Sequence, residues 1–412
     1  MSTRIKRARV ATIFLFFSNG IALSAVTPRL ADLQDQLGMS DVTLGVVLTV
    51  GAAGGLIFGP FAAVGIKKLG SGRFAMLSLL VMLPLLPLVG IVPSAIALAA
   101  VMFAIGAVDS VLDAAQNAHG LQVQRIYKRS IINNMHAFWA LGTVAGALIG
   151  ALTLALDFPL GWTLLGVSIL GVIGTIITFN WVLQPSSTDM GSEEVEAELA
   201  SEIARDNLTS LDPSSLAPAT GITKWKVAGP TLFSLMSIGA LIVMAVIVED
   251  VPQRWSSVYL TDIGMASGGV GFGVVAFTVS LTIGRFLGDS FVNRFGERLV
   301  AQVSMSVVAV VLAGALFMGS GIGFIFACAV VGFGIATLFP AAMHAATYIP
   351  GISAGSAITV VSWISRAGFV FTPVLVGLIS EGLGVQWGIG IAVIAALLII
   401  PLARSLRTKS DI

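Results

Sequence analysis

The sequence predicts an all-α integral membrane protein with twelve transmembrane helices, arranged as two six-helix repeats. Composition, the number of long apolar segments and an internal repeat lead to this prediction. Of the 412 residues, 56% are hydrophobic and 10% are charged, and the mean hydropathy is +0.98. Soluble domains carry about 25% charged residues. The chain therefore has too few charged residues to cover a water-soluble globule, and the soluble class is excluded.

Twelve segments have the length and composition of membrane spans, since a spanning helix needs about 20 mostly apolar residues. The first follows basic residues, as a secretory signal would, but many similar spans come after it. We therefore interpret it as an uncleaved first helix. The expected spans are 10–30, 42–65, 74–93, 95–118, 133–156, 159–183, 229–249, 268–290, 299–319, 323–346, 354–379 and 385–404.

A long polar stretch separates the sixth span from the seventh. It is acidic and carries Ser and Pro near its ends, which is typical of a linker between two folded units. We therefore predict an N-terminal six-helix bundle at 1–183, a cytoplasmic linker at 184–228 and a C-terminal six-helix bundle at 229–412. We expect the protein to act as a monomer.

Basic residues gather in alternate loops and at both ends of the chain, and the opposite loops hold only Arg29 and Arg254. By the positive-inside rule, both termini and the linker are predicted to be cytoplasmic. The expected location is the plasma membrane, which is the inner membrane in a cell that has two membranes. The basic residues on the cytoplasmic side are Arg4, Lys6, Arg7, Arg9, Lys67, Lys68, Arg73, Arg125, Lys128, Arg129, Arg294, Arg298, Arg404, Arg407 and Lys409.

The two halves resemble each other at an offset of about 226 residues. "LGMSDVTLG" at 37–45 matches "IGMASGGVG" at 263–271, and "KKLGSGR" at 67–73 matches "NRFGERL" at 293–299. "DAAQN" at 113–117 lines up with "PAAMH" at 340–344, and Gly142 lines up with Gly368. A duplicated six-helix unit is typical of secondary transporters, whose solute site lies between the repeats near the middle of the membrane.

These features resemble the major facilitator superfamily. The stretch "GRFLGDSFVNRFGER" at 284–298 is similar to that family's glycine-rich loop after the eighth helix. Its first-half copy, "GPFAAVGIKKLGSGR" at 59–73, departs from the pattern, because Lys67 stands where an acid is common. The resemblance implies the fold of that superfamily and transport of a solute by alternating access.

Within the superfamily, "LDAAQNAHG" at 112–120 and "INNMHAFWALGTVAG" at 132–146 resemble the fucose-permease-like branch of sugar permeases. In proton-coupled members, a carboxylate, small residues and an asparagine stand on helix 4, and Asp113 and Asn117 match that pattern. The partner acid on helix 1 has no match, because no Asp or Glu precedes Asp32. The resemblance implies proton coupling at Asp113.

Helix 4 carries a polar face in an otherwise apolar segment. At 100° per residue, Asp109, Asp113, Gln116 and Asn117 fall within an arc of about 100°. A carboxylate inside a membrane is costly, so this face is expected to point to the bundle interior or a wet cavity. We predict that Asp113 carries the coupling proton, with Asp109 as modulator, and that Gln116 and Asn117 bind solute hydroxyls. The alternative is a structural role, with one Asp paired to Arg366 or His136 and the amides bonding between helices.

Other polar residues inside the spans are candidates for the cavity or the gates. Small residues at four-residue spacing on helices 5 and 8 (Gly142, Gly146, Gly150; Gly284, Gly288) predict close helix contacts, and the resemblance to the superfamily implies that these two helices pack on each other. Glu249, Asp250 and Trp255 are expected near the external mouth, in a solvated loop or, alternatively, in contact with the solute. The candidate cavity residues are Asn19, Trp139, His344 and Arg366, and the candidate gate residues are Lys67, Lys68, Arg285, Asp289 and Arg294.

The sequence also excludes several functions. It has no nucleotide-binding G-x-x-x-x-G-K-[ST] motif, its three histidines are dispersed, and Cys328 is its only cysteine. We therefore expect no enzyme activity, no cofactor, no metal and no nucleic-acid partner. The preferred hypothesis is proton-coupled symport of a small polar solute such as a sugar, with sodium as the other candidate ion. The alternatives are a drug/proton antiporter and a membrane sensor or scaffold that does not transport.

Overall fold

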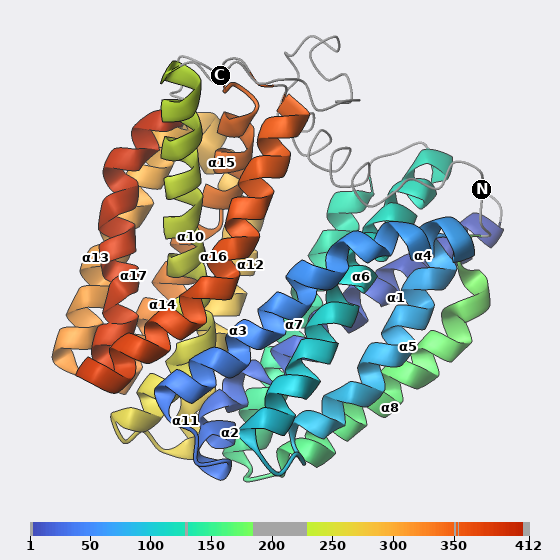
Figure 1. The fold of residues 1–412 in the computed structure, drawn as a ribbon, viewed down its shortest axis with the longest axis horizontal. Coiled ribbons are helices and arrows are strands. Elements are labelled where there is room, and N and C mark those ends of the chain that lie inside the picture. The colour runs from blue at the N-terminus through green and yellow to red at the C-terminus, as the bar shows by residue number, and fades with distance from the viewer. Residues whose placement is uncertain (1–2, 128–130, 184–228, 350–351, 353, 407–412) are drawn as a thin grey trace.

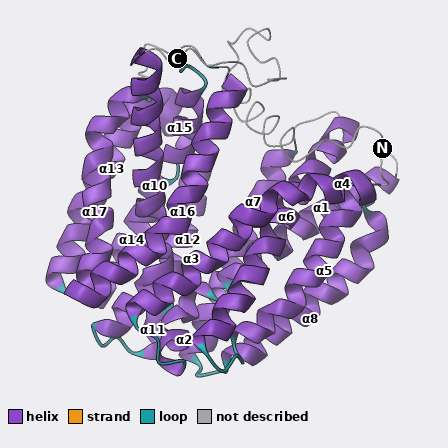
Figure 2. Ribbon diagram, viewed as in Figure 1, coloured by secondary structure: helices purple, strands orange, loops and turns teal. Residues whose placement is uncertain are grey.

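The computed structural model describes residues 3–127, 131–183, 229–349, 352 and 354–406, and within this part of the chain the regular structure is helical (Figures 1 and 2). The predicted linker at 184–228 and the end of the chain at 407–412 lie outside the described residues. The elements of the first half are α1 (Thr3–Ser24), η1 (Thr27–Arg29), α2 (Leu30–Gln36), α3 (Asp41–Phe58), η2 (Gly59–Phe61), α4 (Ala62–Leu69), α5 (Ser71–Val89), α6 (Ala95–Tyr127), α7 (Ile132–Ala155), α8 (Leu160–Thr178) and η3 (Phe179–Trp181). Those of the second half are α10 (Gly229–Asp262), α11 (Ser267–Val270), α12 (Phe272–Phe295), α13 (Glu297–Met318), α14 (Gly321–Ile335), α15 (Leu338–Ala346), α16 (Ala354–Leu383), α17 (Val385–Leu402) and η5 (Ala403–Ser405).

Twelve helical stretches in the described part of the chain are long and apolar enough to cross a membrane, which confirms the predicted fold class. Proline accompanies the breaks in three of the described spans, and a fourth break, in the eighth span, separates α11 from α12 at Gly271. The first span is interrupted at Pro28, the second at Pro60 and the tenth between α14 and α15, just before Pro340. Proline lacks the N–H that the helix ladder needs and so favours a break, although Pro252 and Pro373 lie within continuous helices.

The seventh span differs from the prediction. It was expected at 229–249, whereas α10 continues to Asp262 and the span covers Thr231–Asp262. The expectation that Glu249, Asp250 and Trp255 lie in a solvated external loop is therefore wrong. Asp250 and Trp255 are fully buried inside this helix. The error arose because paired charges lower the local hydropathy without ending the helix.

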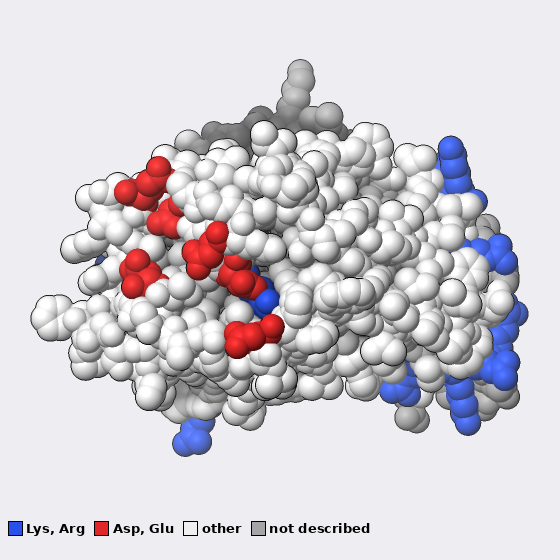
Figure 3. All heavy atoms as spheres, turned by 90° about the horizontal axis from the view of Figure 1, so that it is seen from below, with Lys and Arg blue, Asp and Glu red and all other residues white. Residues whose placement is uncertain are grey.

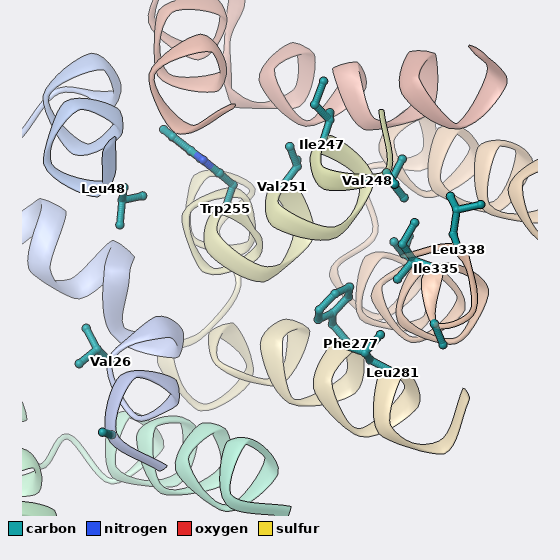
Figure 4. Close-up of a cluster of buried hydrophobic side chains, with 14 of the residues drawn as sticks. Val26, Leu48, Ile247, Val248, Val251, Trp255, Phe277, Leu281, Ile335 and Leu338 are labelled. Carbon is teal, nitrogen blue, oxygen red and sulfur yellow. The ribbon is translucent and has the colours of Figure 1, made fainter. Parts of the chain in front are cut away.

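The same pairs of helices pack on each other within each half. In the first half α3 packs on α6 and α5 on α8, and in the second half the equivalent helices α12 and α13 pack on α14 and α17. The core of the second half lies around α10, where Val251 and Phe277 belong to one buried cluster (Figure 4). The same pattern of contacts in both halves agrees with the sequence repeat.

The glycines of the fifth span pack on the first span. A Cβ atom on Gly142, Gly146 or Gly150 would meet a backbone carbonyl of the first span, and Gly284 and Gly288 of α12 abut the α14–α15 segment. The prediction that these two glycine rows join helices 5 and 8 is therefore wrong. Helices α7 and α12 do contact each other, but through a small cluster made of Ala147, Ala151, Val274 and Val275.

The two halves meet at the end opposite the termini. There α3 crosses α16, and the Thr49 hydroxyl donates to the Val370 carbonyl at 2.8 Å. A Cβ atom on Gly45 would lie 2.5 Å from the Pro373 carbonyl oxygen, so the two backbones are in close contact. Figure 1 shows the helix groups diverging from this seam toward the end that carries both termini.

Candidate functional site

A cavity of about 460 Å³ lies between the halves. Helices α1, α3, α6 and α7, together with η1 and the start of α2, supply one wall, and α10 and α16 supply the other. Its volume falls in the range of small-molecule sites, which is about 300–1,000 Å³. The polar side chains that line it are Asn19, Ser24, Thr27, Asp109, Ser110, Asp113, Trp139, Thr143, Gln253, Arg254 and Arg366.

Three of the predicted residues form a hydrogen-bonded chain across three helices of the first wall. Trp139 Nε1 of α7 donates to Asn19 Oδ1 of α1 at 2.8 Å. Asn19 Nδ2 donates in turn to Asp109 Oδ1 of α6 at 2.6 Å. Both ends of the amide are therefore satisfied, and its N–H side is directed at the carboxylate.

The backbones of α1 and α7 approach closely, which makes the hydrogen bonds from Trp139 through Asn19 to Asp109 possible. Gly20 follows Asn19, and a Cβ atom there would meet the backbone of Trp139 and Thr143. The small residue lets α1 and α7 come together, as small residues do between membrane helices. The Trp139 indole and the Asn19 amide can then meet beside Asp109.

Asp113 stands one helical turn beyond Asp109 and is exposed. Its Oδ1 accepts hydrogen bonds from Gln116 Nε2 at 3.1 Å and Asn117 Nδ2 at 3.2 Å. These two amides are buried and are not among the cavity-lining residues. The predicted polar face of helix 4 thus divides, with the carboxylates at the cavity and the amides behind Asp113.

His344 lies elsewhere. Its Nδ1 is 2.5 Å from Glu297 Oε1, and both side chains are buried at the junction of α15 and α13. The structure therefore places the imidazole in a pair within the second half and outside the cavity lining. Arg366, in contrast, lines the cavity from α16.

The predicted gate residues lie apart from the cavity. Arg285 Nη2 is 3.7 Å from Glu249 Oε1, which links α12 to α10. Arg294 is exposed, and its guanidinium lies 5.4 Å from the ring centre of Phe295. The remaining three candidates, Lys67, Lys68 and Asp289, are exposed side chains.

Sequence reasoning missed the polar residues of α10. Gln253 and Arg254 line the cavity, and Arg254 Nε donates to Asp250 Oδ1 at 2.5 Å. Opposite charges four residues apart on a helix are neighbours on one face. This spacing, followed by the renewed apolar run "WSSVYL", was the available signal that the helix continues through the charges.

Comparison with known proteins gives this cavity its context. The family model described as Major Facilitator Superfamily matches residues 12–253. The chain belongs to this superfamily. The predicted membership is confirmed, and the protein is a multi-pass membrane transporter of a small molecule.

Similar sequences come from several bacteria. The chain is 25% identical to the membrane protein MosC of Rhizobium meliloti over 375 residues, which are 91% of this chain and 84% of that protein. It is 25% identical to an uncharacterized MFS-type transporter of Yersinia pestis over 407 residues, 97% of this chain and 95% of the other. An uncharacterized transporter of Sinorhizobium fredii, y4wD, is 24% identical over 372 residues, 89% of each chain.

Solved structures share the transporter's fold. A variant of the nucleoside transporter NupG has a TM-score of 0.71 at 12% identity, covering 96% of this chain and 98% of its own. A bacterial homolog of the human lysosomal transporter Spinster, inward-facing and occupied, has a TM-score of 0.71 at 14% identity, covering 98% of both chains. A variant of the E. coli fucose:proton symporter FucP has a TM-score of 0.56 at 15% identity, covering 97% of this chain and 98% of its own.

Proposed function

We propose that this transporter is a proton-coupled symporter of a small polar solute, a sugar or a similar molecule. The observation that carries the proposal is the chain Trp139–Asn19–Asp109, which ends on a carboxylate in the cavity between the halves. A carboxylate at membrane depth is costly unless it has a function or a partner. Asp109 takes up and releases the proton, and Asn19 holds one of its oxygens in both states.

Asp113 serves as the proton's route to water. It is exposed and one turn from Asp109, so a proton leaving Asp109 meets it next. This assignment reverses the order that the sequence suggested, in which Asp113 was the carrier and Asp109 its modulator. The reason is position, because Asp109 belongs to the hydrogen-bonded chain across three helices and Asp113 bonds within its own helix.

The transport cycle is alternating access. The bundles at 1–183 and 229–412 rock about the solute, and the α3–α16 seam opens when the cavity faces outward. With Asp109 protonated from outside, the solute binds, the seam closes, and solute and proton leave inward. The proton motive force then drives accumulation.

The charge distribution supports a location in the plasma membrane with both termini in the cytoplasm. Figure 3 shows acidic side chains gathered on the end opposite the termini, where Asp35, Asp157, Asp262 and Glu381 are exposed. Arg29, a cation at that end, is buried and paired with Asp32. In this orientation the structure is the inward-facing state. An impermeant maleimide should label Asp157→Cys in whole cells and leave Lys68→Cys unlabelled, and the opposite result would reverse the orientation.

Proton flux in liposomes tests the proposal. Purified protein is reconstituted in sodium-free buffer with a pH dye inside, and D-glucose, D-glucuronate or tetraphenylphosphonium is added outside. Lumenal acidification with either sugar compound is the expected result. Alkalinisation with the phosphonium would show antiport instead. No pH change with any of the three, repeated with sodium present, would contradict the proton-coupled symport.

A further inference from the structure

A second cavity, of about 370 Å³, lies among α12, α13 and α14, apart from the solute cavity. Its volume is within the range of small-molecule sites, about 300–1,000 Å³. Among the described residues that line it none is charged, and Ser304 and Thr337 supply its polar side chains. The lining also contains large apolar side chains that are exposed, namely Phe291, Phe295, Leu299, Val303 and Phe333. The cavity is therefore an apolar pocket that opens on the surface of the second half.

In the first half, the chain itself fills the equivalent space. A Cβ atom on Gly65 would overlap the ring of Phe74, so this ring packs directly on the helix backbone. At the repeat offset of 226 residues, these two positions become Phe291 and Val300, and both line the cavity. Phe291 is 43% exposed, and Val300 is too short to cover the neighbouring helix as Phe74 does. The second half therefore leaves open a space that the first half closes with its own side chain.

The surface around this pocket contacts lipid. Both α12 and α13 belong to membrane spans, and large apolar side chains beside the pocket are exposed on them. These side chains are Ile283, Phe286, Leu287, Val307 and Val310. Such a surface is stable beside acyl chains, which are as apolar as leucine side chains. A molecule that enters the pocket from this side therefore comes from the bilayer.

A cation stands at the mouth of the pocket. The Arg294 guanidinium lies 5.4 Å from the ring centre of Phe295, which lines the pocket. Arg294 is exposed, and it forms no ion pair within the part of the chain that the structure describes. Arg298 directly precedes Leu299, another lining residue, at the start of α13. An apolar interior is thus combined with two cations at one end.

The acids nearest to these arginines in the sequence face elsewhere. Glu297 is buried and pairs with His344 in the interior of the second half. Asp289 precedes Arg294 by five residues, which is about 140° around the helix, and it is not among the lining residues. The positive charge at the mouth is therefore available to an anionic partner.

The pocket lies at the end of the molecule that carries both termini. Helix α12 runs to this end from α11, which lies at the opposite end (Figure 1). In the proposed orientation, the mouth is at the cytoplasmic leaflet. Anionic lipids give this leaflet a negative surface potential, and basic pockets between helices on this side bind anionic head groups.

We propose that the pocket binds an anionic phospholipid of the cytoplasmic leaflet. One acyl chain enters the apolar interior, and the phosphate binds Arg294 and Arg298. A wholly apolar molecule would leave the two cations unused, and a free phosphate would leave the interior unused. The site lies outside the solute cavity, so it adds to the proposed function without depending on it, and only the choice of leaflet uses the proposed orientation.

Native mass spectrometry of the full-length protein in detergent tests this site. Dioleoylphosphatidylglycerol and dioleoylphosphatidylcholine share their acyl chains and differ in net charge. Each is titrated separately, and the Kd of the first bound lipid is measured. We expect the phosphatidylglycerol to bind at least about tenfold more tightly, because two arginines attract its head group.

The cations are tested with Arg294→Gln/Arg298→Gln, which should abolish the preference for phosphatidylglycerol. The control is Lys68→Gln/Arg73→Gln, which removes two exposed cations from the equivalent loop of the first half. It should keep the preference, because Phe74 closes the space beside that loop.

The interior is tested with Val300→Phe, which supplies the side chain that the first half carries. We expect phosphatidylglycerol to bind at least about tenfold more weakly, because the ring occupies the space of the acyl chain. Val303→Phe fills the same pocket from an exposed position and guards against misfolding of the first variant. Val310→Phe adds the same atoms outside the pocket and should bind lipid as the wild type does.

Equal affinity of the wild type for the two lipids would overturn the inference. A preference that survives in the double arginine variant would overturn it too, as would wild-type affinity in both variants that fill the pocket. Displacement of the lipid by an equimolar amount of sn-glycerol 3-phosphate would identify a site for free phosphate esters instead. The proposed symport is measured separately, so it stands or falls independently of these results.

Discussion

Trp139 orients the amide of Asn19 by donating to its oxygen, which turns the amide nitrogen toward Asp109. Trp139→Phe keeps the aromatic ring and removes this donor. A neutral hydrogen bond contributes about 0.5–1.5 kcal/mol, so transport should slow roughly 2- to 12-fold. The initial rate of solute-driven proton uptake measures this. Trp387→Phe, at an exposed position on α17, is the matched control, and equal rates in both variants would show that the donor is dispensable.

Several residues of the candidate cavity could be predicted from the sequence, because polar side chains within a membrane span point inward. Asn19, Asp109 and Trp139 were each expected there, but nothing in the sequence indicated that they bond to one another. His344 was expected in the cavity as the repeat equivalent of Asn117. The repeat gives His344 and Asn117 equivalent positions along their helices, but it does not determine what surrounds each side chain. The break between α14 and α15, together with the nearby Glu297, places this side chain elsewhere.

At the scale of helices, the seam between α3 and α16 closes the end opposite the termini, which is the external end in the proposed orientation. Gly45→Val would place side-chain atoms against the Pro373 carbonyl and hold the seam open. We expect a cysteine introduced at Ser24, in the cavity, to react faster with an external impermeant maleimide in the Gly45→Val background. The native Cys328 is fully buried and should contribute little labelling.

The control for the seam is Gly314→Val in α13, because no atom lies within 4 Å of a Cβ atom at that position. It should label at the wild-type rate. If Gly45→Val labels no faster than this control, the seam is not the external closure. Gly45 matters at the seam because glycine has no side chain, so it alone lets the backbones of α3 and α16 come this close.

The positions of most helices could be predicted because a membrane helix must be apolar along its length. The prediction was wrong for the end of α10, since hydropathy falls at Glu249 and Asp250 while the helix continues. Arg254 and Arg285 lie beside these carboxylates and compensate their charges. The pairing of Glu249 with Arg285 on another helix is visible only in three dimensions. The glycine rows likewise predicted close packing correctly but not the partner helix, because a small residue is compatible with any neighbour.

For the whole molecule, the repeat, the opposed charge of the two ends and the central cavity together support the proposal of a transporter that alternates between two states. In this account Asp109 couples the movement of the halves to the proton. Exchange of labelled for unlabelled solute requires no net proton movement, whereas accumulation against a gradient does. The two activities can therefore be separated by removing the carboxyl group alone.

The most direct test compares these two activities in Asp109→Asn, with labelled D-glucuronate and D-glucose measured in parallel. The amide keeps the size of the side chain and cannot carry the proton. The account predicts that accumulation driven by a pH gradient falls to the level of empty liposomes while exchange continues. Accumulation at the wild-type level in Asp109→Asn would contradict the assignment of Asp109 as the coupling residue.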